Sequence, residues 1–387
     1  MKAMILAAGK GTRVRPITQA LPKPMIPLVR KPVMVSIIEH LRRYGVKQIM
    51  VNTSHLAPLI ENYFRDGDAF GLQMAYSFEG HKVGDEIQSE ALGSAGGMKK
   101  IQEFSGFFDE TFLVLCGDAL IDLDLSKALA FHRAKKSLAT IVLKEVSLAE
   151  VSKYGVVQTD DTGRIIQFQE KPAQQDAIST TINTGIYIFE PGIFDYIPAN
   201  TPYDIGSQLF PTLAEADLAF YGISLPFQWL DIGSVSDYWY ASREILQGKV
   251  KGYQLPGEEI RPGIYTGINL NVDFDTVEIV PPVYIGSSTS IGAGAKIEGP
   301  TVIGANCVIE GGAIVKECIV DDYTRVNKIA NLKQQIIFDK KCISPSGESL
   351  DIEAADLNWL IDDARKDFKA FDLSYAYQLI SETASSS

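Results

Sequence analysis

A six-residue spacing of aliphatic side chains restricts the fold of this chain more than any other feature. The aliphatic residues stand at every sixth position without interruption: Ile279, Ile285, Ile291, Ile297, Ile303, Ile309 and Val315. A smaller side chain stands two positions before most of them, as at Thr289, Ala295 and Ala313. Repeats of six residues with aliphatic, small and turn positions in register are typical of a parallel β-helix. We therefore predict a left-handed parallel β-helix over residues 263–345.

A β-helix of this type indicates either an acyltransferase domain or a scaffold for assembly. Acyl transfer usually needs a histidine base near the coils, and no histidine follows His132. The scaffold interpretation is therefore favoured, and it predicts a homo-oligomer. Beyond the coils we expect an amphipathic helix from Glu353 to Arg365, within a C-terminal helical cap and tail at 346–387.

The first 248 residues have a different pattern, in which strand-like apolar runs alternate with helical segments. Residues 47–54, 72–78, 111–116 and 138–143 read as strands, and residues 33–44 and 56–64 have apolar side chains at helical spacing. Such alternation predicts an α/β domain with a Rossmann-like mixed, mostly parallel sheet. With a linker at 249–262, the 387 residues then accommodate a catalytic domain and the β-helix.

A glycine-rich turn follows the first apolar run of the chain. Gly9-Lys10-Gly11-Thr12-Arg13 comes directly after the run at 4–8, and Lys23-Pro24 follows ten residues later. Backbone amides at such a turn can hold phosphate, and Arg13 and Lys23 supply the cations for it. Although the net charge is -12, no Asp or Glu precedes Glu39. This local positive charge favours a polyanionic small molecule over nucleic acid, although an ordinary turn with solvated charges is the alternative.

Asp118 follows the apolar run at 112–116, behind Gly117, and lies where ligands bind to α/β sheets. Carboxylate oxygens suit Mg²⁺, so Asp118 is a predicted metal ligand. A helix cap is the alternative for this aspartate. Asp122 and Asp124 are nearby candidates that rank behind it.

Seven motifs in order add a family resemblance to this interpretation. They are Gly9 to Arg13 with Lys23-Pro24, Glu90 to Gly96, Gly117-Asp118, Lys153 to Gly155, Glu170 to Pro172, Asn183 to Gly185, and Trp229 to Gly233. With these motifs, residues 1–240 resemble the sugar-nucleotide pyrophosphorylases. The resemblance implies a nucleotidyltransferase that condenses a sugar 1-phosphate with a nucleoside triphosphate and releases pyrophosphate. That reaction needs positioning and charge neutralisation rather than a protein nucleophile.

The resemblance also implies a role for each residue of the predicted site. Catalysis falls to Arg13, Lys23 and Asp118, and Mg²⁺ binding to Asp118 and Asp231. Nucleotide binding is implied for Leu6, Ala8, Gly9, Gly11, Thr12, Arg13, Glu90, Leu92, Gly93, Ser94 and Gly117. Sugar-phosphate binding is implied for Gly155, Glu170, Lys171, Asn183 and Thr184. Without the resemblance, Gly155 could simply shape a hairpin, and Glu170 with Lys171 could be a surface ion pair.

The base and the sugar are less constrained than the reaction. Many uridylyl- and thymidylyltransferases of the family carry Gln before the Leu-Gly pair, where this chain has Ala91, and residues 90–96 resemble mannose-1-phosphate guanylyltransferases locally. Residues 90–98 together with 116–125 instead resemble cyanobacterial-type UDP-glucose pyrophosphorylases. We therefore expect UTP and glucose 1-phosphate as substrates, with GTP and mannose 1-phosphate as the alternative. A bifunctional acyltransferase and a non-catalytic sugar-nucleotide sensor are the alternatives from other classes.

Four separated cysteines, Cys116, Cys307, Cys318 and Cys342, form no CxxC pair. Their spacing argues against a zinc site or a disulfide framework, so we expect buried thiols in a cytoplasmic protein. No apolar run approaches the ~20 residues of a membrane span. Neither a membrane nor a nucleic acid is therefore an expected partner.

Overall fold

The computed structural model describes residues 1–84 and 86–366, and the chain divides into two compact units. Unit 1 comprises Met1–Ala241 and Val250–Tyr253, and unit 2 comprises Ser242–Lys249 and the chain from Gln254 onward. The predicted linker at 249–262 is therefore divided between the two units. Its last part is ordered, because β16 (Glu258–Arg261) pairs with β17 (Ile264–Thr266).

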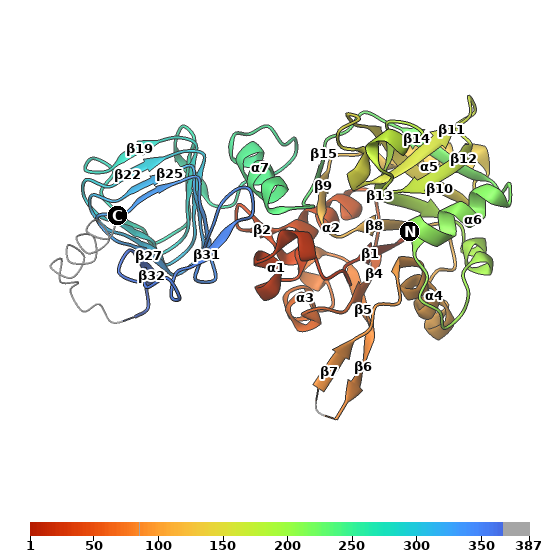
Figure 1. Cartoon of the computed structure of the whole chain (residues 1–387), viewed down its shortest axis with the longest axis horizontal. Coiled ribbons are helices and arrows are strands. Elements are labelled where there is room, and N and C mark those ends of the chain that lie inside the picture. The colour runs from red at the N-terminus through yellow and green to blue at the C-terminus, as the bar shows by residue number, and fades with distance from the viewer. Residues whose placement is uncertain (85, 367–387) are drawn as a thin grey trace. The chain divides into compact units, whose positions relative to one another are not determined.

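Unit 1 contains a nine-stranded mixed sheet, which confirms the predicted Rossmann-like α/β domain (Figure 1). Its strands run in the order β12 (Ile165–Glu170), β11 (Gly155–Thr159), β13 (Thr181–Phe189), β8 (Phe112–Cys116), β1 (Lys2–Leu6), β4 (Gln48–Thr53) and β5 (Gln73–Phe78), while β10 (Ala139–Glu145) pairs with β13 and β14 (Phe220–Ser224). The four strands β8, β1, β4 and β5 are parallel. Ala3, Met4 and Ile5 of β1 are fully buried, as expected for a parallel strand covered on both faces.

Helices connect these strands and cover the sheet. They are α1 (Ile17–Ala20), α2 (Val33–Arg43), α3 (Ala57–Phe64), α4 (Ser94–Ser105), α5 (Leu125–Lys135) and α6 (Phe210–Glu215). The helix α7 (Val235–Leu246) belongs in part to each unit. The apolar spacing predicted helices at 33–44 and 56–64, and α2 and α3 confirm both. In α2 the buried positions include Val33, Ile37 and Leu41, one turn apart, so one face of the helix packs on the core.

The order of the strands places the site at the C-terminal ends of the central strands β1 and β8. β1 pairs with β4 on one side and with β8 on the other, so the loops that leave β1 and β8 diverge at their C-terminal ends. Ligands bind at such a point in open α/β sheets. Two small sheets extend this end of the sheet: β9 (Ala119–Ile121) pairs with β15 (Trp229–Asp231), and β2 (Pro27–Leu28) pairs with β3 (Lys31–Pro32). A hairpin of β6 (Gly80–Val83) and β7 (Glu86–Ser89) extends beyond β5 in Figure 1.

Unit 2 confirms the predicted parallel β-helix. Ile285 pairs with Ile303, Ile291 with Ile309 and Ile297 with Val315, so each partner lies three repeats further along the chain and one coil spans three sheets. The first sheet contains β16, β17, β20 (Val283–Ile285), β23 (Thr301–Ile303), β26 (Ile319–Val320), β29 (Ile336–Phe338), β30 (Lys341–Ile343) and β31 (Ser349–Asp351). The second sheet contains β18 (Asn271–Val272), β21 (Ser290–Ile291), β24 (Val308–Ile309), β27 (Thr324–Val326) and β32 (Ile361–Asp363). The third sheet contains β19 (Glu278–Val280), β22 (Lys296–Glu298), β25 (Ile314–Lys316) and β28 (Asn331–Lys333). Figure 1 shows β19, β22 and β25 stacked as successive layers.

The amphipathic helix predicted from Glu353 to Arg365 is wrong. This segment forms turns and β32, which pairs antiparallel with β27. Asp356 has a positive φ of 54°, which interrupts any helix, and Ile361 is buried against the β-helix core instead. The rest of the predicted cap and tail, residues 367–387, lies outside the described residues. Among the residues that are described, no helix is long and apolar enough to cross a membrane.

The four cysteines are all free thiols. Cys307 and Cys318 lie in the β-helix core, as predicted, whereas Cys116 and Cys342 are only partly buried.

Candidate active site

The glycine-rich turn leaves the C-terminal end of β1 as an open loop. A Cβ atom added at Gly9 would meet no other atom within 4 Å, and both Gly9 and Lys10 are exposed. Gly11 adopts a left-handed φ of 60°, and a Cβ there would lie 2.9 Å from Thr18 Cγ2 and 3.3 Å from Lys23 Cβ. Only glycine therefore lets the turn pack this closely onto the segment that carries Lys23.

Lys23 connects the two predicted metal ligands. Its ammonium group donates to Asp118 Oδ2, and it lies 3.9 Å from Asp231 Oδ1. The strands β9 and β15 explain why the aspartates meet, because Asp231 pairs with Ala119, next to Asp118. The N–H of Ile232 also donates to the carbonyl oxygen of Asp118 at 3.0 Å. The structure thus brings Lys23, Asp118 and Asp231 together, as the sequence predicted.

The electrostatics of this cluster follow from its burial. Burial first, and then the negative charge of Asp118, raise the pKa of Asp231 to about 6, although Lys23 opposes the shift. Burial by itself would lower the pKa of Lys23, but Asp118 and Asp231 outweigh it, so this pKa is raised overall. Two carboxylates around one ammonium leave an excess of negative charge, which a bound cation would relieve.

Gly233 leaves room for the carboxylates of Asp231 and Asp237, and Arg13 lies beside them. A Cβ atom at Gly233 would lie 2.9 Å from Asp231 Oδ2, 3.1 Å from Asp237 Oδ2 and 3.8 Å from Arg13 Nη1. The guanidinium group of Arg13 therefore lies near the aspartates and on the same side as the phosphate turn from which it comes. Both cations of the predicted site are thus available to one group of phosphates.

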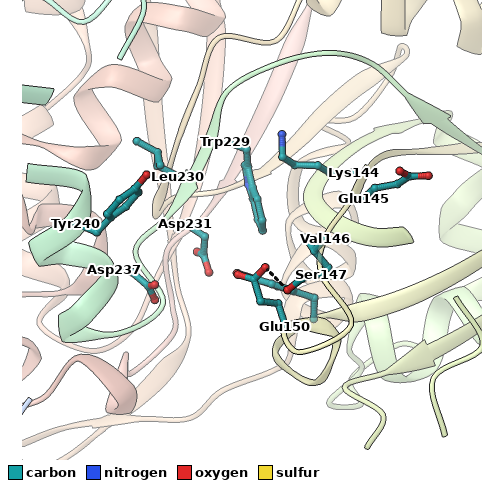
Figure 2. A pocket seen from close by; sticks show the side chains of 11 residues that line it. Lys144, Glu145, Val146, Ser147, Glu150, Trp229, Leu230, Asp231, Asp237 and Tyr240 are labelled. Atoms are coloured by element: carbon teal, nitrogen blue, oxygen red, sulfur yellow. Dashed lines mark hydrogen bonds between the residues drawn. The ribbon is translucent and has the colours of Figure 1, made fainter. Parts of the chain in front are cut away.

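A cavity of about 460 Å³ opens beside Asp231. Its lining includes Trp229, Tyr154 and Glu150, and the rings of Tyr154 and Trp229 have centroids 5.2 Å apart. Figure 2 shows Asp231, Asp237 and Glu150 gathered below Trp229 in the view. The indole Nε1 of Trp229 is buried and has no hydrogen-bond partner among the described residues. A wall with aromatic rings and carboxylates suits a polar ligand such as a sugar.

The resemblance also implies that residues 90–97 read the base, and this base-reading segment leads into α4 and forms its first turn. Gly93 has a φ of 73°, and a Cβ atom there would lie 2.5 Å from the carbonyl oxygen of Tyr203. Ser94 Oγ donates to Asp204 Oδ2 at 2.8 Å and accepts from the N–H of Ile205 at 2.8 Å. The side chain of Ser94 therefore holds the segment in place rather than offering a free hydroxyl. Glu90 is exposed and lies 3.2 Å from His81 Nδ1 of the β6–β7 hairpin.

Of the predicted sugar-phosphate residues, Gly155, Glu170 and Lys171 lie at the hairpin of β11 and β12, whereas Asn183 and Thr184 lie on β13. Gly155 pairs with Glu170, and a Cβ atom at Gly155 would lie 3.0 Å from Glu170 Oε2. Lys171 Nζ lies 2.5 Å from Glu170 Oε1, so the alternative of an ion pair is present in the structure, with the lysine more than half exposed. Asn183 donates to Tyr187 Oη at 3.0 Å. Thr184 is buried and donates to the carbonyl oxygen of Val142 at 2.7 Å, which leaves its side chain inaccessible to a ligand.

A family model for nucleotidyl transferases matches residues 2–248, which is more than half of the chain. This chain belongs to the nucleotidyl transferase family. A second family model, the GMPPB C-terminal domain, matches residues 279–348 of the β-helix.

Several relatives of this nucleotidyl transferase are named for the reaction that they catalyse. The chain is 56% identical to a UTP–glucose-1-phosphate uridylyltransferase of Synechocystis, over 94% of each chain. It is 29% identical to a mannose-1-phosphate guanylyltransferase of Mycobacterium tuberculosis, over 80% of this chain and 82% of the relative. A solved structure of UDP-glucose pyrophosphorylase with UDP-glucose is 26% identical, with a TM-score of 0.54, and covers 64% of this chain and 98% of that one.

The donor set of this nucleotidyl transferase fits a hard divalent cation. In residues 1–84 and 86–366, no group of three or more His, Cys, Asp or Glu side chains could hold a metal ion. Asp118 and Asp231 instead offer two carboxylates on either side of the Lys23 ammonium. Mg²⁺ characteristically uses one or two protein carboxylates together with substrate phosphates. The two aspartates are thus sufficient only when a phosphorylated substrate completes the coordination.

Sequence reasoning missed several polar residues around the site. Asp204 accepts hydrogen bonds from the N–H groups of Gly206 and Ser207, both at 2.9 Å, and from Ser94, at the start of the π-helical turn η7 (Ile205–Leu209). The signal for Asp204 was available, because an Asp before a helical turn is a typical N-cap. Asn52 and Glu79 were also missed; Asn52 lies near the C-terminal end of β4, and Glu79 directly follows β5.

Proposed function

We propose that this nucleotidyl transferase condenses UTP with glucose 1-phosphate to give UDP-glucose and pyrophosphate. The observation that carries the proposal is the convergence of Lys23, Asp118 and Asp231 beside an open glycine-rich turn at the end of β1. Such an arrangement supplies backbone donors and cations for a triphosphate and carboxylates for a divalent cation.

The reaction transfers the uridylyl group of UTP to the sugar phosphate. A phosphate oxygen of the sugar phosphate forms a bond to the α-phosphorus of UTP, the bond from that phosphorus to the bridging oxygen breaks, and pyrophosphate leaves with the electron pair. Arg13 and Lys23 hold the triphosphate and stabilise the departing charge. Asp118 and Asp231 would hold Mg²⁺, which neutralises charge on the phosphates when it is bound. Lys23 then exchanges its carboxylate partners for phosphate oxygens.

The sugar phosphate would be bound at the β11–β12 hairpin and the cavity beside Asp231. Lys171 is the proposed cation for its phosphate, because the side chain is exposed. To bind the phosphate, the ammonium group has to give up its ion pair with Glu170. Glu170, the amide of Gly155 and Asn183 are the proposed partners for sugar hydroxyls. We leave Thr184 out of this set, because its buried hydroxyl is already bonded within the sheet.

Uracil and glucose are favoured by the uridylyltransferase relative at 56% identity. The second candidate is GTP with mannose 1-phosphate, which is favoured by the guanylyltransferase relatives and by the GMPPB C-terminal domain match. In both cases we propose that the N–H groups of Gly93 and Ser94 contact the base, since Ala91 offers no side-chain donor or acceptor and the backbone groups of Leu92 are already bonded to Glu79 and Tyr203.

The decisive experiment measures pyrophosphate release from UTP or GTP, each with glucose 1-phosphate or mannose 1-phosphate, in the presence of Mg²⁺. We expect the UTP and glucose 1-phosphate pair to have the highest kcat/KM. A higher value for the GTP and mannose 1-phosphate pair would select the second candidate. No release from any pair, with Mn²⁺ tried in place of Mg²⁺, would remove both.

Two further parts of the proposal concern the protein as a whole. We propose that the β-helix mediates assembly of a homo-oligomer, because its repeated coils form a rigid scaffold. A monomer mass in light scattering would reject this. The cytoplasm is the proposed compartment, supported by four free thiols.

A further inference from the structure

Asn52 and Glu79 form a buried hydrogen-bonded pair beside the C-terminal ends of β4 and β5. Asn52 Nδ2 donates to Glu79 Oε1 at 2.7 Å, and the two residues are only 3% and 1% exposed. A carboxylate is rarely buried this deeply, and it is tolerated only where its oxygens are fully hydrogen-bonded. The groups that donate hydrogen bonds to Asn52 and Glu79 therefore indicate the role of the buried pair.

The two side chains are hydrogen-bonded to the two segments that are proposed to bind one nucleotide, namely the glycine-rich phosphate turn and the base-reading segment. The N–H of Ala7, which leads into the phosphate turn, donates to Asn52 Oδ1 at 2.8 Å. The N–H of Leu92, in the base-reading segment, donates to Glu79 Oε2 at 3.0 Å. We infer that Asn52 and Glu79 are positioning residues that hold the phosphate turn and the base-reading segment at one fixed spacing. The inference rests on the proposed function, which assigns both segments to the same nucleotide.

The chemistry of the four groups fixes the direction of every hydrogen bond. Backbone N–H groups at both ends can only donate, so Asn52 must accept from Ala7 with its oxygen and donate to Glu79 with its nitrogen. Glu79 must then accept at both of its oxygens. An ionised carboxylate does this, whereas a glutamine at the same position has one acceptor and would leave one donor unpaired.

The surroundings of Glu79 are built to keep it in this place. A Cβ atom at Gly97 of α4 would overlap Glu79 Oε1, so the glycine makes room for the carboxylate. The main-chain oxygen of Glu79 accepts from Ser54 Oγ at 2.9 Å and from the N–H of Glu90 at 3.2 Å. The hydrogen bond from Glu90 closes the base of the β6–β7 hairpin. It brings the start of the base-reading segment back to the C-terminal end of β5, next to Glu79.

The test uses three variants of the full chain with UTP and Mg²⁺ as the probe. Glu79→Gln removes one acceptor, and Asn52→Asp places two carboxylates face to face. The double variant Asn52→Asp with Glu79→Gln satisfies every donor again, because the new carboxylate accepts from Ala7 and from the glutamine amide, whose oxygen accepts from Leu92. We expect Glu79→Gln to weaken UTP binding about ten-fold, the effect of one unpaired buried donor. The double variant should recover most of the loss.

Two controls separate positioning from general stability. Glu61→Gln is the matched control, because Glu61 accepts a single hydrogen bond, from Thr53 Oγ1 at 3.0 Å, and glutamine keeps that acceptor. It should leave the UTP affinity unchanged. In Glu79→Gln the KM for glucose 1-phosphate should also stay within about two-fold of the wild-type value, because a positioning role acts on the nucleotide alone.

Each other outcome overturns the inference. These outcomes are a wild-type UTP affinity in Glu79→Gln, a double variant that binds UTP no better than the worse single variant or does not fold, and equal changes in KM for both substrates. UTP binding is measured by calorimetry without sugar phosphate, so it does not depend on turnover. If the wild-type protein binds UTP but releases no pyrophosphate with any sugar phosphate, the proposed function fails while the calorimetry still decides the role of Asn52 and Glu79.

Discussion

Lys23 forms an ion pair with Asp118, although the two residues are 95 positions apart in the chain. The pair joins the segment after the phosphate turn to the end of β8. Without substrate, the ammonium group neutralises part of the charge of a carboxylate that is proposed to hold a cation. Substrate phosphates can take over the ammonium group, which frees the carboxylate when the cation arrives with the nucleotide.

Replacing Asp118 should stop turnover without unfolding the protein. We expect Asp118→Asn to lower kcat by about 100-fold or more, because the charge that holds the cation is lost while the shape is kept. Pyrophosphate release at saturating substrates measures the effect. Asp124→Asn is the matched control, since Asp124 caps α5 through the N–H of Ser126 at 3.0 Å and asparagine caps equally well. Near wild-type activity in Asp118→Asn would show that the metal ligand lies elsewhere.

The raised pKa of Asp231 predicts a pH effect on stability in the absence of metal and substrate. An unfolded aspartate titrates near pH 4, as a rough value, and Asp231 titrates at about 6 in the folded protein. Between these values the folded state holds more protons, so the free energy of unfolding falls as the pH rises from about 4 to about 6. Asp231→Asn avoids this loss and should stabilise the metal-free protein at pH 7 by roughly 2 kcal/mol.

Thermal unfolding at pH 7 and at pH 4, in a chelator, checks this prediction. The stabilisation by Asp231→Asn should be present at pH 7 and absent at pH 4. A lower Tm at pH 7 would instead mean that the attraction between Lys23 and Asp231 outweighs the cost of burying the carboxylate.

Lys171→Ala tests the sugar-phosphate site. The KM for the sugar phosphate should rise about ten-fold or more, with a smaller change in the KM for the nucleotide, because the ammonium contacts only one reactant. The lysine is more than half exposed, so Tm should not change. Lys127→Ala removes another lysine that is more than half exposed and serves as the control. An unchanged KM for the sugar phosphate would contradict the assignment of Lys171.

Gly286→Ala tests the packing of the β-helix coils. A Cβ atom at Gly286 would overlap the backbone of Gly304 in the next coil, which cannot move aside as a side chain can. We expect a cost of about 1–3 kcal/mol, the usual range for overpacking, seen as a lower Tm in calorimetry. In Gly192→Ala the new methyl group would lie 3.4 Å from Leu138 Cδ1, an ordinary contact, so its Tm should be close to the wild-type value. Equal Tm values would show that the coils are not packed this tightly.

The sequence predicted those parts of the fold that depend on local spacing. The aliphatic residues from Ile279 to Val315 predicted the β-helix because a regular repeat puts equivalent side chains on equivalent faces of successive coils. The segment from Glu353 to Arg365 shows where this reasoning ends. Its apolar residues fit a helix, but pairing of Ile361 and its neighbours with β27 decided the structure.

By itself, the sequence determined the residue types of the site, namely the turn from Gly9 to Arg13, Lys23 and the two aspartates. Only the tertiary structure decided which of them meet. Asp118 and Asp231 converge because β9 and β15 pair, and Thr184 is withdrawn from the site because its strand lies inside the sheet. The buried link between Asn52 and Glu79 was equally invisible, because long-range strand pairing, rather than any local pattern, places two distant polar side chains in contact and makes each the other's partner.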